Sequence, residues 1–137
     1  MATQAYVNDL AYEIVGCAIE VHKHIGPGLL ESVYEECFKE ELRLSGLDFE
    51  TQIEVPIVYK NSTLSKSLRL DLLIEDLIIV ELKSVDTILP VFSAQLLSYL
   101  KLTNKPKGLL INFNSTNITK NGLVPIVTDI FAQLPEK

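Results

Sequence analysis

The sequence predicts an α/β domain over residues 1–137, in which helices flank a mixed sheet. Three observations lead to this fold class. Apolar residues recur at three- and four-residue steps up to residue 45, alternate loosely from residue 49 to residue 83, and return to helical spacing from residue 91 before a short apolar run. These patterns give the element order ααβββαβ, and a chain of 137 residues fits a single domain.

Two amphipathic helices are expected first, over residues 5–24 and 29–45. The sequence Gly-Pro-Gly at 26–28 separates them, because glycine adopts left-handed backbone angles and proline cannot continue a helix. Gly46 ends the second helix. The side chains expected to face the core are Leu10, Ile14, Ala18, Val21 and Ile25 in the first helix, and Leu30, Val33, Tyr34, Cys37, Phe38 and Leu42 in the second.

Three strands are expected next. The first covers residues 49–59, where Pro56 indicates an edge strand or a bulge. A turn at 61–63 follows it, and strands over 67–74 and 77–83 form a hairpin around Glu75 and Asp76.

The rest of the chain is expected to add one helix and one buried strand. The helix covers residues 91–102, with Pro90 at a position that the first turn permits. The nearly continuous apolar run at 107–113 is typical of a strand that is buried on both faces. A short strand or helix ending near residue 134 completes the chain.

The net charge of −6 is unevenly distributed along the chain. Residues 1–54 carry eleven acids and three bases, whereas residues 55–137 carry nine bases and seven acids. Phosphate binding depends largely on lysine and arginine, so the total charge argues against a nucleic-acid partner. The C-terminal part remains compatible with one.

The chain is expected to be cytoplasmic and not bound to a membrane. Its first residues have neither the basic head nor the apolar run of a secretory signal. No stretch approaches the roughly 18 apolar residues of a membrane span. Cys17 and Cys37 have no metal-ligand spacing and are expected to be small buried side chains in a reducing compartment.

Asp71, Glu81 and Lys83 form the candidate catalytic group. Side chains two residues apart in a strand share a face, so Glu81 and Lys83 point the same way. Asp71 falls opposite Glu81 if residues 74 and 78 pair across a three-residue loop. A two-residue loop would instead turn Asp71 to the other face. The functional interpretation therefore requires an odd register, or a bulge that restores it.

Two facing carboxylates repel each other by roughly 4 kcal/mol at about 4 Å and an effective dielectric constant of about 20. A divalent cation reverses the sign of that interaction. Asp71, Glu81 and the backbone carbonyl of Leu82 suit Mg²⁺ or Mn²⁺, which favour hard oxygen ligands. Lys83 would assist the attacking water and offset charge on the phosphate. The alternative is an exposed sheet face with surface ion pairs.

Three further side chains are candidates for this site. Gln95 and Tyr99 lie one turn apart on a helix that is apolar nearly all round, so Gln95 is expected to be buried and to need polar partners. A metal site with ordered water would supply them, and so would a neighbouring backbone group. Glu31 lies beside the core-facing stripe of Tyr34 and Phe38. It would reach the sheet as a further ligand, or only favour the helix dipole.

These residues carry a resemblance to a known family. Gly28, Glu31 and Tyr34 match the signature of the GxxExxY proteins, which belong to the PD-(D/E)XK nuclease superfamily. The resemblance extends over most of the chain through the segments at residues 26–31, 69–73, 79–85, 94–103 and 108–113.

The resemblance implies an αβββαβ core with an extra N-terminal helix, and it implies a nuclease that cuts DNA or RNA with Mg²⁺. Asp71 resembles the motif aspartate, and residues 81–83 resemble the E-x-K element. Gln95 and Tyr99 are similar to the Gln/Tyr motif of related exonucleases, and Glu31 is similar to a first-helix acid.

The function expected from the sequence is thus metal-dependent hydrolysis of a phosphodiester, with Asp71, Glu81, Lys83, Gln95 and Glu31 at the site. The alternative is a nuclease fold that binds nucleic acid or a protein partner without cutting it. A homodimer that pairs through the edge strand at Pro56 is compatible with either function, because one small domain offers little surface to grip a duplex.

Overall fold

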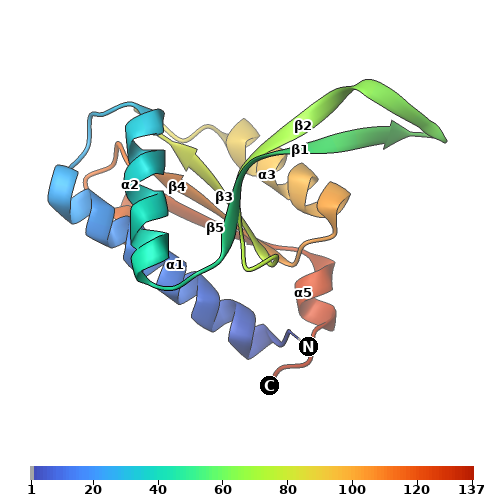
Figure 1. Ribbon diagram of the computed structural model, residues 1–137, viewed down its shortest axis with the longest axis horizontal. Helices are drawn as coiled ribbons and strands as arrows, with labels where there is room; N and C mark the ends of the chain where they lie inside the picture. Colours follow the sequence, from blue (N-terminus) through green and yellow to red (C-terminus); the bar gives the residue numbers. More distant parts are fainter. Residues whose placement is uncertain (1) are drawn as a thin grey trace.

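A five-stranded sheet with helices on both sides forms the centre of the molecule (Figure 1). The structure is a computed structural model that describes residues 2–137. Its elements in chain order are α1 (Gln4–Ile25), α2 (Glu31–Leu44), β1 (Phe49–Tyr59), β2 (Ser62–Ile74), β3 (Ile78–Lys83), α3 (Pro90–Thr103), β4 (Lys107–Asn112), α4 (Ile118–Asn121), β5 (Leu123–Val127) and α5 (Asp129–Gln133).

The strands follow one another across the sheet in the order β1-β2-β3-β4-β5. Only β3 and β4 run parallel, and α3 connects them, because parallel neighbours need a crossover. The other neighbouring strands are antiparallel. The predicted fold class is therefore confirmed: this is a mixed α/β sheet with an additional N-terminal helix.

The helices α1 and α2 cover one face of the sheet, and their inward stripes were largely predicted. Leu10, Ile14, Ala18 and Val21 of α1 are buried in this layer. In α2 the buried stripe runs at four-residue steps and consists of Tyr34, Phe38 and Leu42.

Three residues that were predicted to face this layer are exposed. Leu30 is 74% exposed because α2 begins only at Glu31, which leaves Leu30 in extended backbone as the N-cap residue. Val33 is exposed because it lies one position beside the buried stripe of α2. Ile25, the last residue of α1, is also exposed.

On the other face, α3 packs against the sheet through one narrow stripe. Leu96 and Leu100 are fully buried against Ile79 and Leu110. The apolar composition of α3 predicted that the helix is substantially buried. That prediction was wrong, since half of the Val91 surface remains exposed. The described residues place no further layer over the outer side of this helix, so an apolar composition alone overestimated its burial.

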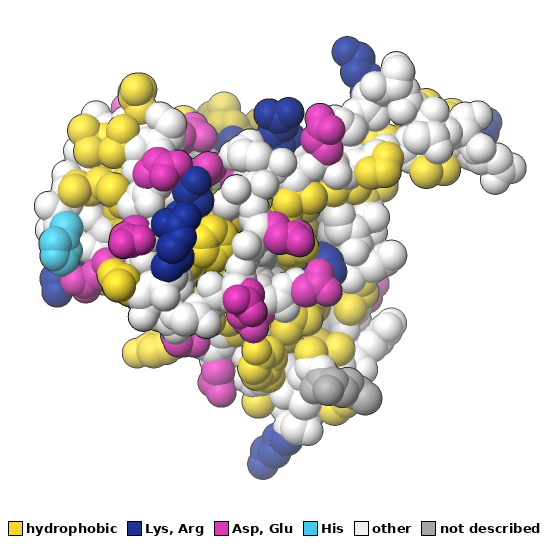
Figure 2. Space-filling model, viewed as in Figure 1, with side chains coloured by type: hydrophobic (Ala, Val, Ile, Leu, Met, Phe, Trp, Pro, Cys, Tyr) yellow, Lys and Arg dark blue, Asp and Glu magenta, His cyan; other side chains and the backbone are white. Residues whose placement is uncertain are grey.

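The strands β1 and β2 form a long hairpin that extends away from the helices (Figures 1 and 2). β1 matches its predicted bounds, but β2 begins five residues before the predicted residue 67 and leaves a short turn at 60–61. The register shifts between Pro56 and Val58, and β1 lies at the edge of the sheet. Both structural interpretations of Pro56, edge strand and bulge, are thus confirmed.

The two ends of the described chain lie side by side (Figure 1). The Gln4 amide donates a hydrogen bond to the Pro135 carbonyl at 2.7 Å, and the Ala5 amide donates to the Glu136 carbonyl at 3.0 Å. Among residues 2–137, none of the helices combines the length and the apolar character that crossing a membrane requires.

Candidate functional site

The hairpin between β2 and β3 has the odd register that the site requires. Ile74 pairs with Ile78 across a three-residue loop, in which Glu75 and Asp76 adopt positive φ angles of 52° and 56°. The loop is tied to the start of β1, because the Asp48 amide donates to the Glu75 carboxylate at 2.6 Å and the Glu75 amide donates to the Asp48 carbonyl at 2.9 Å.

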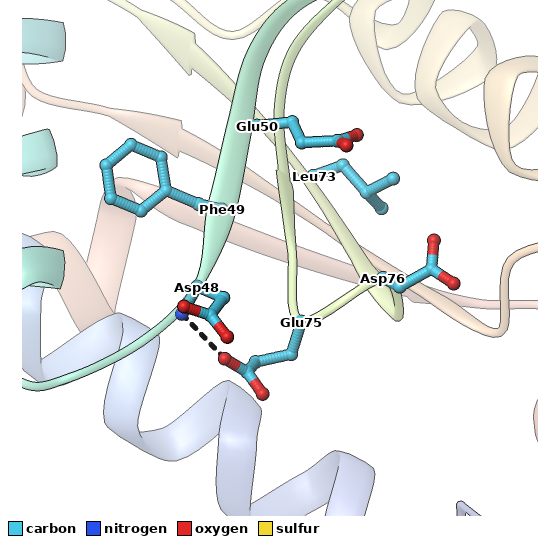
Figure 3. A pocket seen from close by; sticks show the side chains of 6 residues that line it. All are labelled: Asp48, Phe49, Glu50, Leu73, Glu75 and Asp76. Atoms are coloured by element: carbon cyan, nitrogen blue, oxygen red, sulfur yellow. Dashed lines mark hydrogen bonds between the residues drawn. The ribbon is translucent and has the colours of Figure 1, made fainter.

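Figure 3 shows that loop at the rim of a cavity of about 370 Å³. Its lining residues are Asp48, Phe49, Glu50, Leu73, Glu75 and Asp76. The Glu75 carboxylate serves the loop itself through its hydrogen bond to the Asp48 amide. This cavity therefore lies at the loop that sets the register of β2 on β3. The candidate site lies further along these strands.

One residue beyond the last paired position, the two strands separate around the predicted carboxylates. The ladder between β2 and β3 ends at the pair Leu72–Val80, so the next residues in register are Asp71 and Glu81. There the backbone amides bond to side chains. The Asp71 amide donates to Glu81 Oε2 at 3.3 Å, and the Leu82 amide donates to Asp71 Oδ2 at 2.9 Å. Asp71 and Glu81 thus converge on one face of the sheet.

The pairing of β2 with β1 is irregular at the same point. Thr51 pairs with Leu72 and Ile53 pairs with Leu70, while Gln52 between them has a positive φ of 50°. This local distortion lies beside Asp71, whose amide is bonded to Glu81. Irregular strands are common next to active sites, where they redirect a side chain or end the pairing.

The electrostatic state of Glu81 follows from this geometry. Its side chain is buried, it shares a hydrogen bond with the Asp71 side chain, and it faces the negative charge of Asp71. In that order, these causes raise the pKa of Glu81 to about 9. At neutral pH and without a cation, Glu81 therefore keeps its proton.

The converging side chains line a small polar cavity of about 180 Å³ between the sheet and α3. Its lining residues are Glu31, Arg69, Asp71, Glu81, Lys83, Phe92, Gln95, Leu96 and Tyr99. The site residues expected from the sequence thus come from four elements, α2, β2, β3 and α3, to one place. Leu82 and Tyr34 do not line the cavity.

Lys83 reaches the cavity from the end of β3. Its ammonium nitrogen lies 4.5 Å from the centroid of the Phe92 ring, which provides a cation–π contact. Arg69 also lines the cavity. Its guanidinium nitrogen Nη2 lies 3.5 Å from Oε1 of Glu54 on the neighbouring strand.

The sequence interpretation missed Arg69 and Phe92 as lining residues. Arg69 precedes Asp71 by two positions in the same strand, and Phe92 precedes Gln95 by three positions in the same helix. Both spacings place a side chain beside a predicted site residue, so the signal was present in the pattern.

Gln95 and Tyr99 both line the cavity, but the predicted burial of Gln95 was wrong. Gln95 is exposed, because only the Leu96 and Leu100 stripe of α3 is covered by the sheet. The argument that a buried amide must find polar partners therefore does not apply to it. Tyr99 is half-buried, and burial together with the charges of Glu81 and Asp71 raises its pKa.

Glu31 reaches the cavity from the first turn of α2, and a fixed loop precedes it. The Tyr34 hydroxyl donates to the Gly26 carbonyl at 2.5 Å and accepts from the Leu29 amide at 3.2 Å. Gly28 has a φ of +99°, which side chains other than glycine rarely adopt. The spacing of these three residues thus has a structural reason. Gly28 permits the turn, Tyr34 holds the loop, and Glu31 extends into the cavity.

The environment of Glu31 differs from that of Glu81. Glu31 is exposed, but partial desolvation raises its pKa, Lys83 lowers it, and Asp71 raises it further. The loop before Glu31 is also tied to β3, because the Ser84 hydroxyl donates to the Leu29 carbonyl at 2.5 Å. Glu31 and Lys83 therefore line the same cavity, close enough for their charges to interact.

A buried amide supports the segment that follows Lys83. Asn112 at the end of β4 accepts from the Val85 amide at 3.0 Å and donates to the Val85 carbonyl at 2.9 Å. The Phe113 amide donates to the Lys83 carbonyl at 2.9 Å. These bonds fix the end of β3, and Asn112 is a structural residue that the sequence interpretation did not single out.

The donor set at this cavity fits a hard divalent cation. Asp71 and Glu81 offer carboxylate oxygens on one face, and a doubly charged ion would replace the proton that Glu81 keeps. Within residues 2–137 there is no cluster of three or more His, Cys, Asp or Glu side chains placed to hold a metal. Two carboxylates with water and substrate oxygens are a usual donor set for Mg²⁺, which keeps several of its waters.

Paired carboxylates and a lysine on neighbouring strands, in an αβββαβ core, define a nuclease-like class of α/β protein. The comparison with protein families agrees with that class. The family model described as the PD-(D/E)XK nuclease superfamily matches residues 8–123, and the chain belongs to that superfamily. Its members are generally nucleases. The comparisons with curated proteins and with solved structures found no match.

Proposed function

We propose that this chain is a nuclease that hydrolyses phosphodiester bonds of DNA or RNA and depends on Mg²⁺ or Mn²⁺. The observation that carries the proposal is the convergence of two carboxylates, each of which accepts a backbone amide of the opposite strand, with a lysine on the same cavity. Membership of a nuclease superfamily supports the same activity. The proposal treats residues 1–137 as one nuclease domain of the cytoplasm.

In this proposal Asp71 and Glu81 hold the cation, and the Leu82 carbonyl joins them through the backbone, since the Leu82 side chain is buried in the core and does not line the cavity. A divalent cation at such a position lowers the pKa of water and offsets negative charge on a phosphate. Glu31 is auxiliary: it holds a water of the cation, because the described residues place no third carboxylate where it would bind the ion directly, and it lies on the cavity wall close enough to Asp71 for their charges to interact.

The remaining site residues act on the water and the phosphate. Lys83 orients the attacking water and stabilises charge that develops on the phosphate oxygens. Gln95 orients the water or the phosphate through its amide, and its exposure leaves that amide accessible to a substrate. Tyr99 supports Gln95 from the next turn of α3, and Tyr34 supports Glu31 through the loop that it holds.

Within the superfamily, we place the chain in the GxxExxY group. The support is the structural role of its three signature residues. Gly28 permits the turn, Tyr34 holds the loop, and Glu31 lines the cavity.

The test is hydrolysis of labelled single- and double-stranded DNA and RNA with Mg²⁺ or Mn²⁺. We expect Asp71→Asn and Lys83→Ala to lower the rate by at least about 100-fold, as the loss of transition-state stabilisers does in other enzymes. Lys101→Ala, an exposed lysine of α3 outside the cavity, is the matched control and should leave the rate unchanged.

Equal rates for all four proteins would mean that a contaminant cuts the substrate. Saturable binding of nucleic acid without cleavage, in the presence of either metal, would instead support the alternative of a non-cleaving module. A homodimer is compatible with the proposed function, and the solution mass measures it.

A further inference from the structure

The outer part of the β1–β2 hairpin, residues 55–68, is a two-stranded arm beyond the rest of the sheet (Figure 1). β2 pairs with β3 only through residues 72–74, and the described residues pair β1 only with β2. The arm therefore contributes little to the core, and Val58, Tyr59 and Leu64 near its tip are exposed. Packing against the core therefore does not explain the length of the arm, which points to a role in binding.

The arm is basic in an otherwise acidic chain. Residues 55–68 contain Lys60 and Lys66 and no acid. Since the whole chain carries −6 and the arm +2, the remainder carries −8. Lys60 and Lys66 are exposed, and dark blue side chains stand on the arm in Figure 2. A basic stretch of this kind attracts a polyanion, which the acidic remainder repels.

The arm is continuous with the candidate site. Arg69 lines the cavity, and β2 runs from Asp71 past Arg69 and Lys66 to the turn at residues 60–61. At about 3.3 Å per residue, the tip lies roughly 30 Å along the ribbon from Asp71. At about 3.4 Å per nucleotide of one strand, that length spans about nine phosphates.

We infer that this arm holds the phosphate backbone of the nucleic acid, through Lys60 and Lys66, up to about nine nucleotides from the bond to be cut. The inference rests on the proposed function and adds to it a binding surface outside the cavity. A two-stranded ribbon has the width that enters a nucleic-acid groove. Tyr59 offers an exposed ring against which a base stacks, and the Lys60 ammonium nitrogen lies 5.5 Å from the centroid of that ring.

A second copy of this chain fits the arm less well. Pro56, the register shift after it and the lysines are features that keep exposed edge strands from pairing with one another. Pairing of two arms would also bring their lysines together, which is unfavourable.

The test compares two double variants in an Asp71→Asn background, which prevents cleavage. Lys60→Ala/Lys66→Ala removes the arm charges. Lys23→Ala/Lys120→Ala removes two exposed lysines of α1 and α4 and is the matched control. The probes are fluorescein-labelled DNA and RNA oligonucleotides of about 6 and about 25 nucleotides, chosen to be shorter and longer than the arm. Fluorescence anisotropy measures Kd over a series of salt concentrations.

We expect the arm variant to raise Kd for the long oligonucleotide about 10-fold or more and to lower the salt slope by about two. The preference for the long over the short oligonucleotide should shrink by a similar factor. The control should match the parent protein. A Kd and a salt slope unchanged by the arm variant would overturn the inference, and they leave the proposed function standing if the wild type still cuts.

Failure of the wild type to bind or cut any oligonucleotide would overturn the proposed function and the inference together. A wild-type dimer in solution that the arm variant dissociates, with nucleic-acid binding unchanged, would show that the arm contacts a second copy. The unfolding midpoints of both double variants check that each protein is folded.

Discussion

At the scale of single residues, Glu81 links the candidate site to stability. In the folded protein its pKa lies near 9, whereas the ordinary value is 4.5. Between these values the folded protein keeps a proton that the unfolded chain has lost, so unfolding releases it. The stabilisation is complete below about pH 4.5 and is lost as the pH rises towards about 9.

We therefore expect the metal-free protein to become less stable from about pH 5 to about pH 8, by at most about 1.4 kcal/mol per pH unit for one proton. Urea unfolding in the presence of a chelator measures this slope. Glu81→Gln keeps the shape and neutrality of the protonated side chain and should flatten it. A variant as steep as the wild type would show that another group titrates.

Tyr34 is a second residue with a defined contribution. Its hydroxyl makes two hydrogen bonds to the loop at 26–30, and its ring stacks on Phe113 at 4.6 Å between centroids. Tyr34→Phe keeps the stacking and removes the bonds, so we expect a loss of about 1–2 kcal/mol in the free energy of unfolding. Tyr12→Phe alters a tyrosine that is 85% exposed and should have no effect in the same urea titration.

The outcome for individual site residues separates what a pattern can predict from what it cannot. The period of two put Glu81 and Lys83 on one face, but it left the side of Asp71 open until the register of β2 on β3 was known. The predicted burial of Gln95 was wrong, because the burial of a helix depends on what packs against it and not on its own composition.

At the scale of elements, the end of β3 depends on β4. Asn112 is 3% exposed and saturates both backbone groups of Val85. Asn112→Ala leaves these groups without their partner, so we expect a loss of about 2–3 kcal/mol in the free energy of unfolding. We also expect faster hydrogen exchange at the Val85 amide, measured by NMR. Asn8→Ala, with one exposed hydrogen bond from Lys107, is the control and should leave exchange at Val85 unchanged.

Among the strands, the sequence pattern predicted the buried strand β4 but not the exposed start of β2. The long apolar run predicted β4 well, since a central strand is apolar on both sides. The start of β2 was missed because residues 62–66 are mostly polar and exposed, so they carry no alternation. The sequence left both a two-residue and a three-residue loop open. Neither Glu75 nor Asp76 is a residue type that predicts two successive left-handed conformations.

At the scale of the whole molecule, binding of a cation to the folded state should raise stability by mass action. At a Mn²⁺ concentration of about 100 times Kd, the gain is about 2.7 kcal/mol. For a domain of this size, that gain corresponds to a rise in Tm of roughly 10 °C. Thermal unfolding with and without Mn²⁺ measures it.

Asp71→Asn should abolish the rise in Tm, because it removes a ligand and leaves the fold intact. An equal rise for this variant would mean that Mn²⁺ binds elsewhere. A wild type whose Tm is indifferent to Mn²⁺ and to Mg²⁺ would contradict the cation site that the carboxylate pair supports.

The hydrogen bonds from Gln4 and Ala5 to Pro135 and Glu136 have a consequence for engineering. Since the two ends already touch, a peptide of a few residues would join them into a ring without strain. The chain could then be opened at Lys60, where the backbone is exposed and makes a tight turn. Such a circular permutant would keep the pairing of β1 with β2, and the tip of the hairpin would become the new pair of chain ends.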